Sequence, residues 1–125
     1  MDVKKQIEYW RKGAAEDWEI AGDLVHREKP RYGLFFAHLA LEKALKAHVC
    51  RATQDIAPRT HALLRLAELS QLRISANQKV FFSEFDRYQI EGRYPETLMP
   101  PPSPDEGRAQ LRKAEEIFQW LMRQL

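Results

Sequence analysis

The stretch that most constrains the fold of this chain is "LFFAHLALEKALKAHV", residues 34–49. Apolar residues occupy most of the circumference of a helix here, whereas a helix on the surface of a protein shows a single apolar stripe. The main polar side chains, His38, Glu42 and Lys46, are spaced four apart, so they stack on one face. We therefore expect a helix over about 31–52 that is packed on several sides and forms the centre of a bundle.

The segment before it has the pattern of an amphipathic helix over residues 3–25. Its apolar residues recur on one side of a 3.6-residue helix: Val3, Ile7, Trp10, Ala14, Trp18, Ala21 and Val25. Pro30 breaks the pattern, because proline cannot continue a helix but is tolerated in the first turn of the next one. The sequence therefore predicts two long helices in succession.

Two shorter helices are expected in the middle of the chain. Thr60 is a candidate N-cap for a short helix over 61–72, "HALLRLAELSQL". Ser75, with Gln78 three residues later, has the spacing of a capping box.

The capping box opens a fourth helix that runs through the apolar residues Val80, Phe81, Phe85 and Tyr88. Gly92 and Pro95 are suitable stop signals for this helix.

The last segment begins with a proline-rich loop, residues 95–104, which we expect to be extended and stiff. Ser103 and Glu106 form another capping box, with Pro104 at the first helical position. The final helix carries its apolar residues on one face: Leu111, Ala114, Ile117, Phe118, Leu121 and Met122. Strict alternation of apolar and polar residues never lasts, so the predicted fold is all-α, an antiparallel up-and-down bundle of four to five helices.

Length and composition agree with one globular domain over residues 1–125. Apolar residues make up 44% of the chain and charged residues 30%. The net charge of +2 gives no global field that would attract a polyanion, so contact with nucleic acid would need a local patch. No apolar run approaches the roughly 18 to 20 residues that cross a bilayer. The N-terminus lacks the pattern of a signal peptide, and the single cysteine suits a reducing compartment, so we expect a cytoplasmic protein without membrane contact.

Several classes of chemistry have no signature in the sequence. A glycine-rich phosphate loop and a Gly-x-Ser-x-Gly elbow are both missing. His48 and Cys50 point to nearly opposite sides of a helix, and the other histidines, His26, His38 and His61, have no partner at ligand spacing. We therefore predict neither a metal site nor a cofactor.

The polar stripe of the central helix is the first candidate constellation. His38, Glu42 and Lys46, together with Asp17 of the first helix, are expected to form a polar seam inside the bundle or at a dimer interface. Glu42 and Lys46 have the spacing of an ion pair within a helix. The alternative is that the stripe lines part of a ligand pocket.

The second constellation is the exit of the fourth helix, "DRYQIEGRYPE", residues 86–96. Arg87 and Arg93 present planar donors suited to phosphate, and Tyr88 and Tyr94 present aromatic faces suited to a base. In the alternative interpretation the tyrosines anchor the helix end in the core, and the arginines are solvated or paired with Asp86, Glu91 and Glu96.

Taken together, four segments resemble those of the HEPN domain family. They are "AAEDWEIA", "FFAHLALEKALKA", "PRTHALLRLAEL" and "GRYPE", in the order and spacing of the family, over about residues 10–96. The resemblance implies a helical bundle that usually forms a homodimer and pairs with a separate minimal nucleotidyltransferase. Many such pairs behave as toxin and antitoxin.

The resemblance also bears on catalysis. Family members that act as metal-independent ribonucleases carry an arginine followed, after four to six residues, by a histidine late in the bundle. This chain has Arg87 and Arg93 in that region but no histidine after His61. Arg31 and His38 have the right spacing but lie at the wrong end of the pattern, so we interpret that match as chance. The turn "GRYPE" instead matches a subgroup with an Arg-Tyr-Pro-acid turn, for which the resemblance implies nucleotide or substrate binding.

Three hypotheses follow. The first is a non-catalytic subunit that docks a nucleotidyltransferase and binds a nucleotide or the substrate of the transferase. The second is an RNA-cleaving toxin with a degenerate site, in which Arg87 or Arg93 holds phosphate and a tyrosine or Glu91 replaces the histidine. The third is a purely structural dimer, in which the turn only ends a helix.

Overall fold

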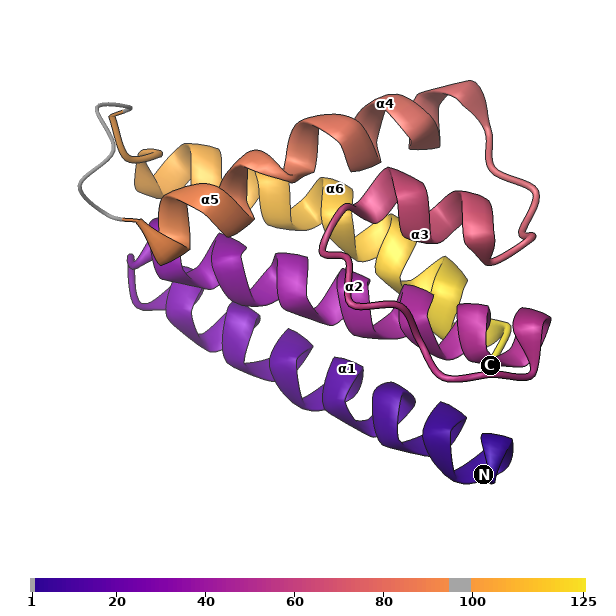
Figure 1. Cartoon of the computed structure of the whole chain (residues 1–125). Coiled ribbons are helices and arrows are strands. Elements are labelled where there is room, and N and C mark those ends of the chain that lie inside the picture. Colours follow the sequence, from indigo (N-terminus) through magenta and orange to yellow (C-terminus); the bar gives the residue numbers. More distant parts are fainter. Residues whose placement is uncertain (1, 95–99) are drawn as a thin grey trace.

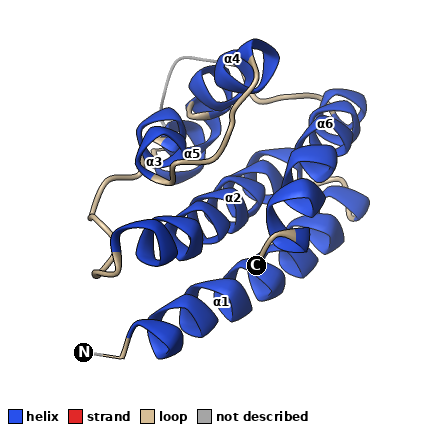
Figure 2. Ribbon diagram, turned by 90° about the vertical axis from the view of Figure 1, so that its right-hand side faces the viewer, coloured by secondary structure: helices blue, strands red, loops and turns tan. Residues whose placement is uncertain are grey.

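Helix α2, Pro30–Thr53, is the centre of the molecule, as its sequence predicted. The computed structural model describes residues 2–94 and 100–125. Within α2, every residue from Ala44 to Cys50 is buried, and other helices surround most of its length (Figures 1 and 2). The all-round apolar pattern thus reflects real burial on several sides.

Helix α1, Val3–His26, runs antiparallel to α2 and packs along it (Figure 1). The buried residues of α1 are mostly small, including Ala14 and Ala21, which lets the two helices approach closely. The two helices lie close together at Gly33, where an added Cβ would lie 2.5 Å from Cγ2 of Val25.

The remaining helices cover the rest of α2. They are α3 (Leu63–Leu69), α4 (Ala76–Phe85), α5 (Arg87–Arg93) and α6 (Pro104–Arg123). Helices α3, α5 and α6 pack directly on α2, whereas α4 packs against α3. Because α1, α2, the successive pair α4 and α5, and α6 alternate in direction (Figure 1), the predicted all-α, up-and-down bundle is confirmed.

No strand occurs in residues 2–94 or 100–125. Among those same residues, no helix combines the length and the apolar character that a membrane span requires.

The prediction for the third helix was wrong in both its cap and its length. Helix α3 covers Leu63–Leu69, and its N-cap residue, Ala62, makes no side-chain capping bond. The Thr60 hydroxyl accepts a bond from the N–H of Ala62, so it closes a local turn. The N–H of Leu63 instead donates to the carboxylate of Asp86, 23 residues further along the chain, at 3.2 Å. A tertiary contact has replaced the local cap.

The fourth predicted helix is interrupted at Asp86, which separates α4 from α5. Gly92 was expected to stop this helix, but it lies inside α5, which ends at Arg93. An added Cβ at Gly92 would lie 2.5 Å from the side chain of Phe35, so the glycine allows α5 to lie close against α2. The other expected stop signal, Pro95, lies outside the described residues.

Local start signals were predicted more accurately. Ser75 and Gln78 form the complete capping box at the start of α4. Ser103 accepts a bond from the N–H of Glu106, which is one half of the predicted capping box, and Pro104 is the first residue of α6. Both helices begin at the residue that the local sequence predicted.

Helix α6 is fixed to α1 and α2 by one aromatic and one polar contact. The rings of Trp18 and Phe118 stack with their centres 4.6 Å apart. The buried His48 donates its Nε2–H to the carbonyl oxygen of Leu121 at 2.9 Å, and its Nδ1 accepts from Arg51. This arrangement uses the neutral imidazole, because a proton on Nδ1 would face the guanidinium group. Burial, which is the main cause, and Arg51 together lower the pKa of His48.

The tight approach at Gly33 yields a test of helix packing. The Gly33→Ala variant is expected to lose about 1–3 kcal/mol of unfolding free energy, because the new methyl group overlaps Val25. Gly22→Ala is the matched control, since nothing lies within 4 Å of its added Cβ. That variant should gain up to about 1 kcal/mol from helix propensity. Urea unfolding followed by circular dichroism measures both, and equal effects would contradict the packing described.

His48 gives a dependence of stability on pH. Its pKa in the folded chain lies below the ordinary value of about 6.5, so the unfolded chain takes up a proton first as the pH falls. The contribution of His48 is therefore complete above about pH 7 and is lost as the pH falls through 6.5 towards the lowered folded value. Unfolding measured from pH 8 to 5 should show a smaller loss of stability in His48→Gln than in the natural chain. Identical profiles would contradict this assignment.

Candidate functional site

The polar stripe of α2 lies inside the bundle of a single chain. His38, Glu42 and Lys46 are 0%, 4% and 6% exposed. His38 and Glu42 form polar contacts with residues outside α2, and Lys46 pairs with Glu42 within α2. The stripe therefore has the geometry of a polar seam, the first of the two predicted interpretations.

His38 is bonded to the junction between α4 and α5. Its Nε2–H donates to Oδ1 of Asp86 at 2.9 Å, and the same oxygen accepts the N–H of Leu63. One carboxylate thus joins α2, the start of α3 and the break between α4 and α5. The Nδ1 of His38 lies 3.9 Å from Oε1 of Glu42, too far for a hydrogen bond.

Glu42 holds the loop before α3 against α2. Its carboxylate accepts from Nζ of Lys46 at 3.0 Å, which confirms the predicted pair. Both of its oxygens lie 3.1 Å from Nδ1 of His61. Because a carboxylate only accepts, the Nδ1 of His61 donates to Glu42. The side chain of His61 is 48% exposed.

One further contact connects the seam to α1. The Nζ of Lys46 lies 5.1 Å from the centre of the Trp10 ring, in cation-π geometry. Asp17, which was predicted to belong to the seam, instead forms an ion pair of 2.7 Å with Lys43, a residue of α2 outside the stripe. Sequence analysis predicted the stripe, but it missed Asp86 and His61, whose partners are 48 and 19 residues away.

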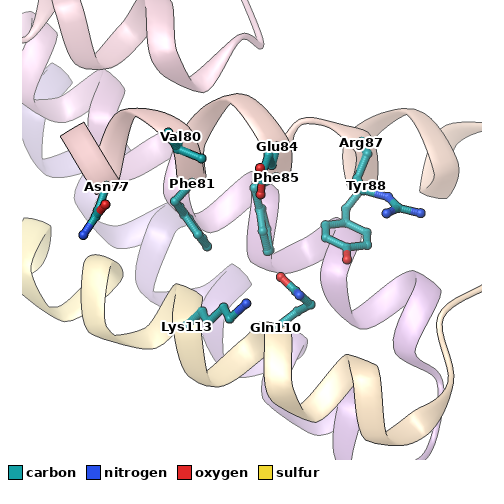
Figure 3. Close-up of a pocket in the computed structure, with 9 residues that line it drawn as sticks. All are labelled: Asn77, Val80, Phe81, Glu84, Phe85, Arg87, Tyr88, Gln110 and Lys113. Atoms are coloured by element: carbon teal, nitrogen blue, oxygen red, sulfur yellow. The ribbon is translucent and has the colours of Figure 1, made fainter. Parts of the chain in front are cut away.

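A hollow of about 620 Å³ lies between α4 and α5 on one side and α6 on the other (Figure 3). We call it the α4/α6 groove. Its lining residues are Asn77, Val80, Phe81, Glu84, Phe85, Arg87, Tyr88, Gln110 and Lys113. Helix α4 packs against α3 while α6 packs against α1 and α2, which leaves space between α4 and α6.

The inner wall of the α4/α6 groove is aromatic. Phe81, Phe85 and Tyr88 point from α4 and α5 towards α6, with Gln110 and Lys113 opposite them (Figure 3). Phe81 and Phe85 stack at 4.9 Å, and the ring of Tyr88 meets Phe85 edge-on at the same distance. The wall is therefore a packed row of rings, in which Phe85 and Tyr88 are buried and Phe81 is partly buried.

Arg87 lies at one end of this row. Its Nε and Nη2 donate to Oε1 of Glu91 at 3.1 and 2.9 Å, and its guanidinium carbon lies 5.3 Å from the centre of the Tyr88 ring. The hydrogen bond to Glu91 raises the pKa of Arg87, so this side chain is a cation at any physiological pH. Burial raises the pKa of the Tyr88 phenol, which therefore stays protonated.

The four residues predicted to bind phosphate do not form one cluster. Arg87 and Tyr88 line the α4/α6 groove, whereas Arg93 and Tyr94 are exposed at the end of α5 and do not line it. Arg93 is six residues after Arg87, roughly 240° around a helix, so the two point in different directions. Pro95 and Glu96 of the "GRYPE" turn lie outside the described residues. Lys113 was missed, because by sequence it is one charge among many on the wet face of α6.

Comparison with known proteins gives a family and a fold. The model of the HEPN domain matches residues 7–125. The structure is similar to the crystal structure of TT1696 from Thermus thermophilus, with a TM-score of 0.78 and 21% sequence identity. The similarity covers 96% of this chain and 98% of that one. No curated protein matches the sequence.

The buried carboxylate of Glu42 provides a test of the seam. Glu42→Ala would leave the ammonium of Lys46 buried without its partner, so we expect a loss of about 3–5 kcal/mol in unfolding free energy. Glu8→Ala is the control, because Glu8 pairs with Arg11 on the exposed surface. Its loss should be much smaller, because solvent screens an ion pair on the exposed surface. Chemical unfolding of both variants measures the difference, and similar losses would show that the seam is unimportant.

Proposed function

The chain belongs to the HEPN domain family, and from this premise we propose that it is a non-catalytic binding subunit that holds a nucleotide or phosphorylated substrate in the α4/α6 groove. The observation that carries the proposal is the position of Arg87. Its guanidinium group lies over the Tyr88 ring at the edge of a hollow whose inner wall is aromatic.

Arg87 retains the capacity to bind an anion. A guanidinium group has five N–H donors, and two of them bond to Glu91, so three remain. The side chain is 48% exposed, which makes these donors accessible. The bond to Glu91 also fixes the plane of the guanidinium, which lowers the entropy lost when a phosphate binds.

The aromatic wall suits the other half of a nucleotide. A base that stacks on an aromatic ring gains about 1–3 kcal/mol, and Phe81, the partly buried ring of the row, offers such a surface beside the buried Phe85 and Tyr88. The volume of about 620 Å³ lies within the usual range for small-molecule sites, about 300–1,000 Å³.

Binding is supported more strongly than catalysis. Histidine is absent from the residues that line the α4/α6 groove. Tyr88 has a raised pKa and is a poor general base at neutral pH. Arg87 is permanently charged and cannot transfer a proton. The groove thus offers groups that hold an anion, and its lining carboxylate, Glu84, is exposed to solvent, so the lining lacks an imidazole to transfer protons near pH 7.

The proposal includes two protein partners, a second copy of the chain and a minimal nucleotidyltransferase. Membership of the HEPN family and the resemblance to its Arg-Tyr-Pro-acid subgroup support both partners. The reading frame next to the gene identifies the expected transferase most directly. Light scattering with size-exclusion chromatography measures whether the chain is a dimer and whether it binds that transferase.

Metal-independent cleavage of RNA is the second candidate function. His61 favours it, because Glu42 engages Nδ1 of this half-exposed imidazole and so orients its ring, as carboxylates orient a catalytic histidine. It ranks second because neither His61 nor Glu42 lines the groove that contains Arg87. A ribonuclease needs both the phosphate-binding cation and the base at one scissile bond.

Removal of the Arg87 side chain tests the proposed function. Titration calorimetry with adenosine diphosphate should show binding at or below millimolar concentration, and Arg87→Ala should weaken it about tenfold or more, since a charged hydrogen bond contributes about 1.5–3 kcal/mol. Arg112→Ala is the matched control, because Arg112 is an exposed arginine of α6 outside the groove.

The natural chain and the variants Arg87→Ala, Arg93→Ala and His61→Ala should also be incubated with cellular RNA. We expect the RNA to remain intact. Cleavage that disappears in Arg87→Ala, Arg93→Ala or His61→Ala would favour the ribonuclease instead. If the nucleotide fails to bind and RNA is not cut, both candidate functions are wrong.

A further inference from the structure

A second hollow, of about 380 Å³, lies where α1 turns into α2. Its lining residues come from this turn and from the chain at the start of α6: Glu28, Lys29, Pro30, Arg31, Tyr32, Pro101, Pro102 and Pro104. The turn and the start of α6 lie at the same end of the bundle (Figure 1). None of these residues lines the α4/α6 groove, so the two hollows are separate sites. We call this one the turn hollow.

Close packing and backbone bonds hold the walls of the turn hollow in place. Helix α6 lies so near the start of α2 that an added Cβ at Gly107 would lie 2.5 Å from Cβ of Pro30. Across the turn, the N–H of Lys29 donates to the carbonyl oxygen of Leu24 at 2.9 Å. The proline rings also have few internal rotations. A ligand therefore meets a surface that is already formed, which lowers the entropy lost on binding.

Arg31 is the side chain that marks the turn hollow as a binding site. It is partly buried, and its Nε is buried without a hydrogen-bond partner. Within residues 2–94 and 100–125, no carboxylate lies within ion-pair distance of Arg31, whereas Arg87 and Arg108 both pair with carboxylates of their own helices. A buried donor without a partner is costly and rare in folded proteins. Arg31 therefore points to an acceptor that comes from outside the chain.

The charges around the turn hollow favour an anion as that acceptor. Lys29 and Arg31 contribute two cations and Glu28 one carboxylate, so the lining has a net charge of +1. Lys29 is exposed and, in the part of the chain that the structure describes, forms no ion pair. A guanidinium group binds a carboxylate or a phosphate through two parallel hydrogen bonds. An oxyanion thus suits the polar part of the hollow.

The rest of the lining is apolar and flat. Tyr32 is 48% exposed, and Pro101 and Pro104 are also exposed, so these rings are accessible to a ligand. An accessible aromatic ring packs well against another flat apolar group. The volume of about 380 Å³ lies within the usual range for small-molecule sites, about 300–1,000 Å³.

We propose that the turn hollow binds a small molecule in which an oxyanion, a phosphate or a carboxylate, is attached to a flat apolar group. The oxyanion lies on Arg31 and Lys29, and the apolar group lies against Tyr32 and the prolines. This inference goes beyond the proposed function, because it assigns a second site that shares no lining residue with the α4/α6 groove.

Titrations followed by NMR test both halves of this ligand with phenyl phosphate, benzoate, inorganic phosphate and benzyl alcohol. Phenyl phosphate, benzoate or both should bind at or below about 10 mM, the affinity usual for a ligand of this size, and shift the amide signals of Arg31 and Tyr32. The tighter of the two identifies the oxyanion. Inorganic phosphate should bind at least about fivefold more weakly than the tighter probe, and benzyl alcohol should not bind detectably, because each lacks one half of the ligand.

Three variants locate the ligand. Arg31→Gln should weaken the tighter probe about tenfold or more, because its charged hydrogen bonds are lost. Tyr32→Leu should weaken that probe about threefold or more and leave inorganic phosphate unchanged. Glu28→Gln removes a nearby negative charge and should tighten binding about two- to fivefold, which damage to the fold would not do. Arg112→Gln is the matched control for charge, and circular dichroism checks that each variant is folded.

Adenosine diphosphate separates this inference from the proposed function. Its affinity should be unchanged in Arg31→Gln, and the affinity of the tighter probe should be unchanged in Arg87→Ala. Failure of both phenyl phosphate and benzoate to bind would overturn this inference and leave the proposed function intact. Loss of the tighter probe in Arg87→Ala but not in Arg31→Gln would place it in the α4/α6 groove, and the inference would again be wrong. Inorganic phosphate that binds as tightly as the better probe would also contradict it.

Discussion

The hydrogen bond of 2.9 Å between His38 and Asp86 is the contact on which the arrangement of the bundle depends. His38 belongs to the central helix and is completely buried, and Asp86 separates α4 from α5 and also caps the first N–H of α3. Four helices therefore meet at one carboxylate. Glu42 and Lys46 continue the same stripe towards His61 and Trp10. Because an unpaired polar group is costly in the interior, these partners specify one packing of helices around α2.

The same contact connects the fold to the proposed binding site. Asp86 points to α2 and α3, while its neighbours Phe85 and Arg87 line the groove that faces α6. Because Asp86 is bonded to α2 and α3, the segment around it has a fixed orientation. The aromatic row and the guanidinium group of Arg87 therefore face α6. The polar seam thus lies on one side of the segment around Asp86, and the α4/α6 groove lies on the other side. We propose binding as the role of the groove, and the seam supplies the rigidity that such a site requires.

The sequence was sufficient for those parts of the fold that depend on neighbours along the chain. The periodicity of α1, α2 and α6 and the cap at Ser75 are local, and the structure has them where they were expected. The cap of α3 and the break at Asp86 were not predictable, because they depend on partners 23 and 48 residues away. For the proposed site, Arg87 and Tyr88 were predicted from their local density. Lys113 was not predicted, because it lines the groove only through the space left between α4 and α6.

A double-mutant cycle between His38 and Asp86 tests the central claim most directly. The unfolding free energies of His38→Leu, Asp86→Ala and the double variant are compared with that of the natural chain, so that effects of each site alone cancel. The account predicts a coupling energy of at least about 1 kcal/mol, as expected for a hydrogen bond to a charged group. Additive losses, with a coupling energy near zero, would show that the two residues do not hold the bundle together and would contradict the account.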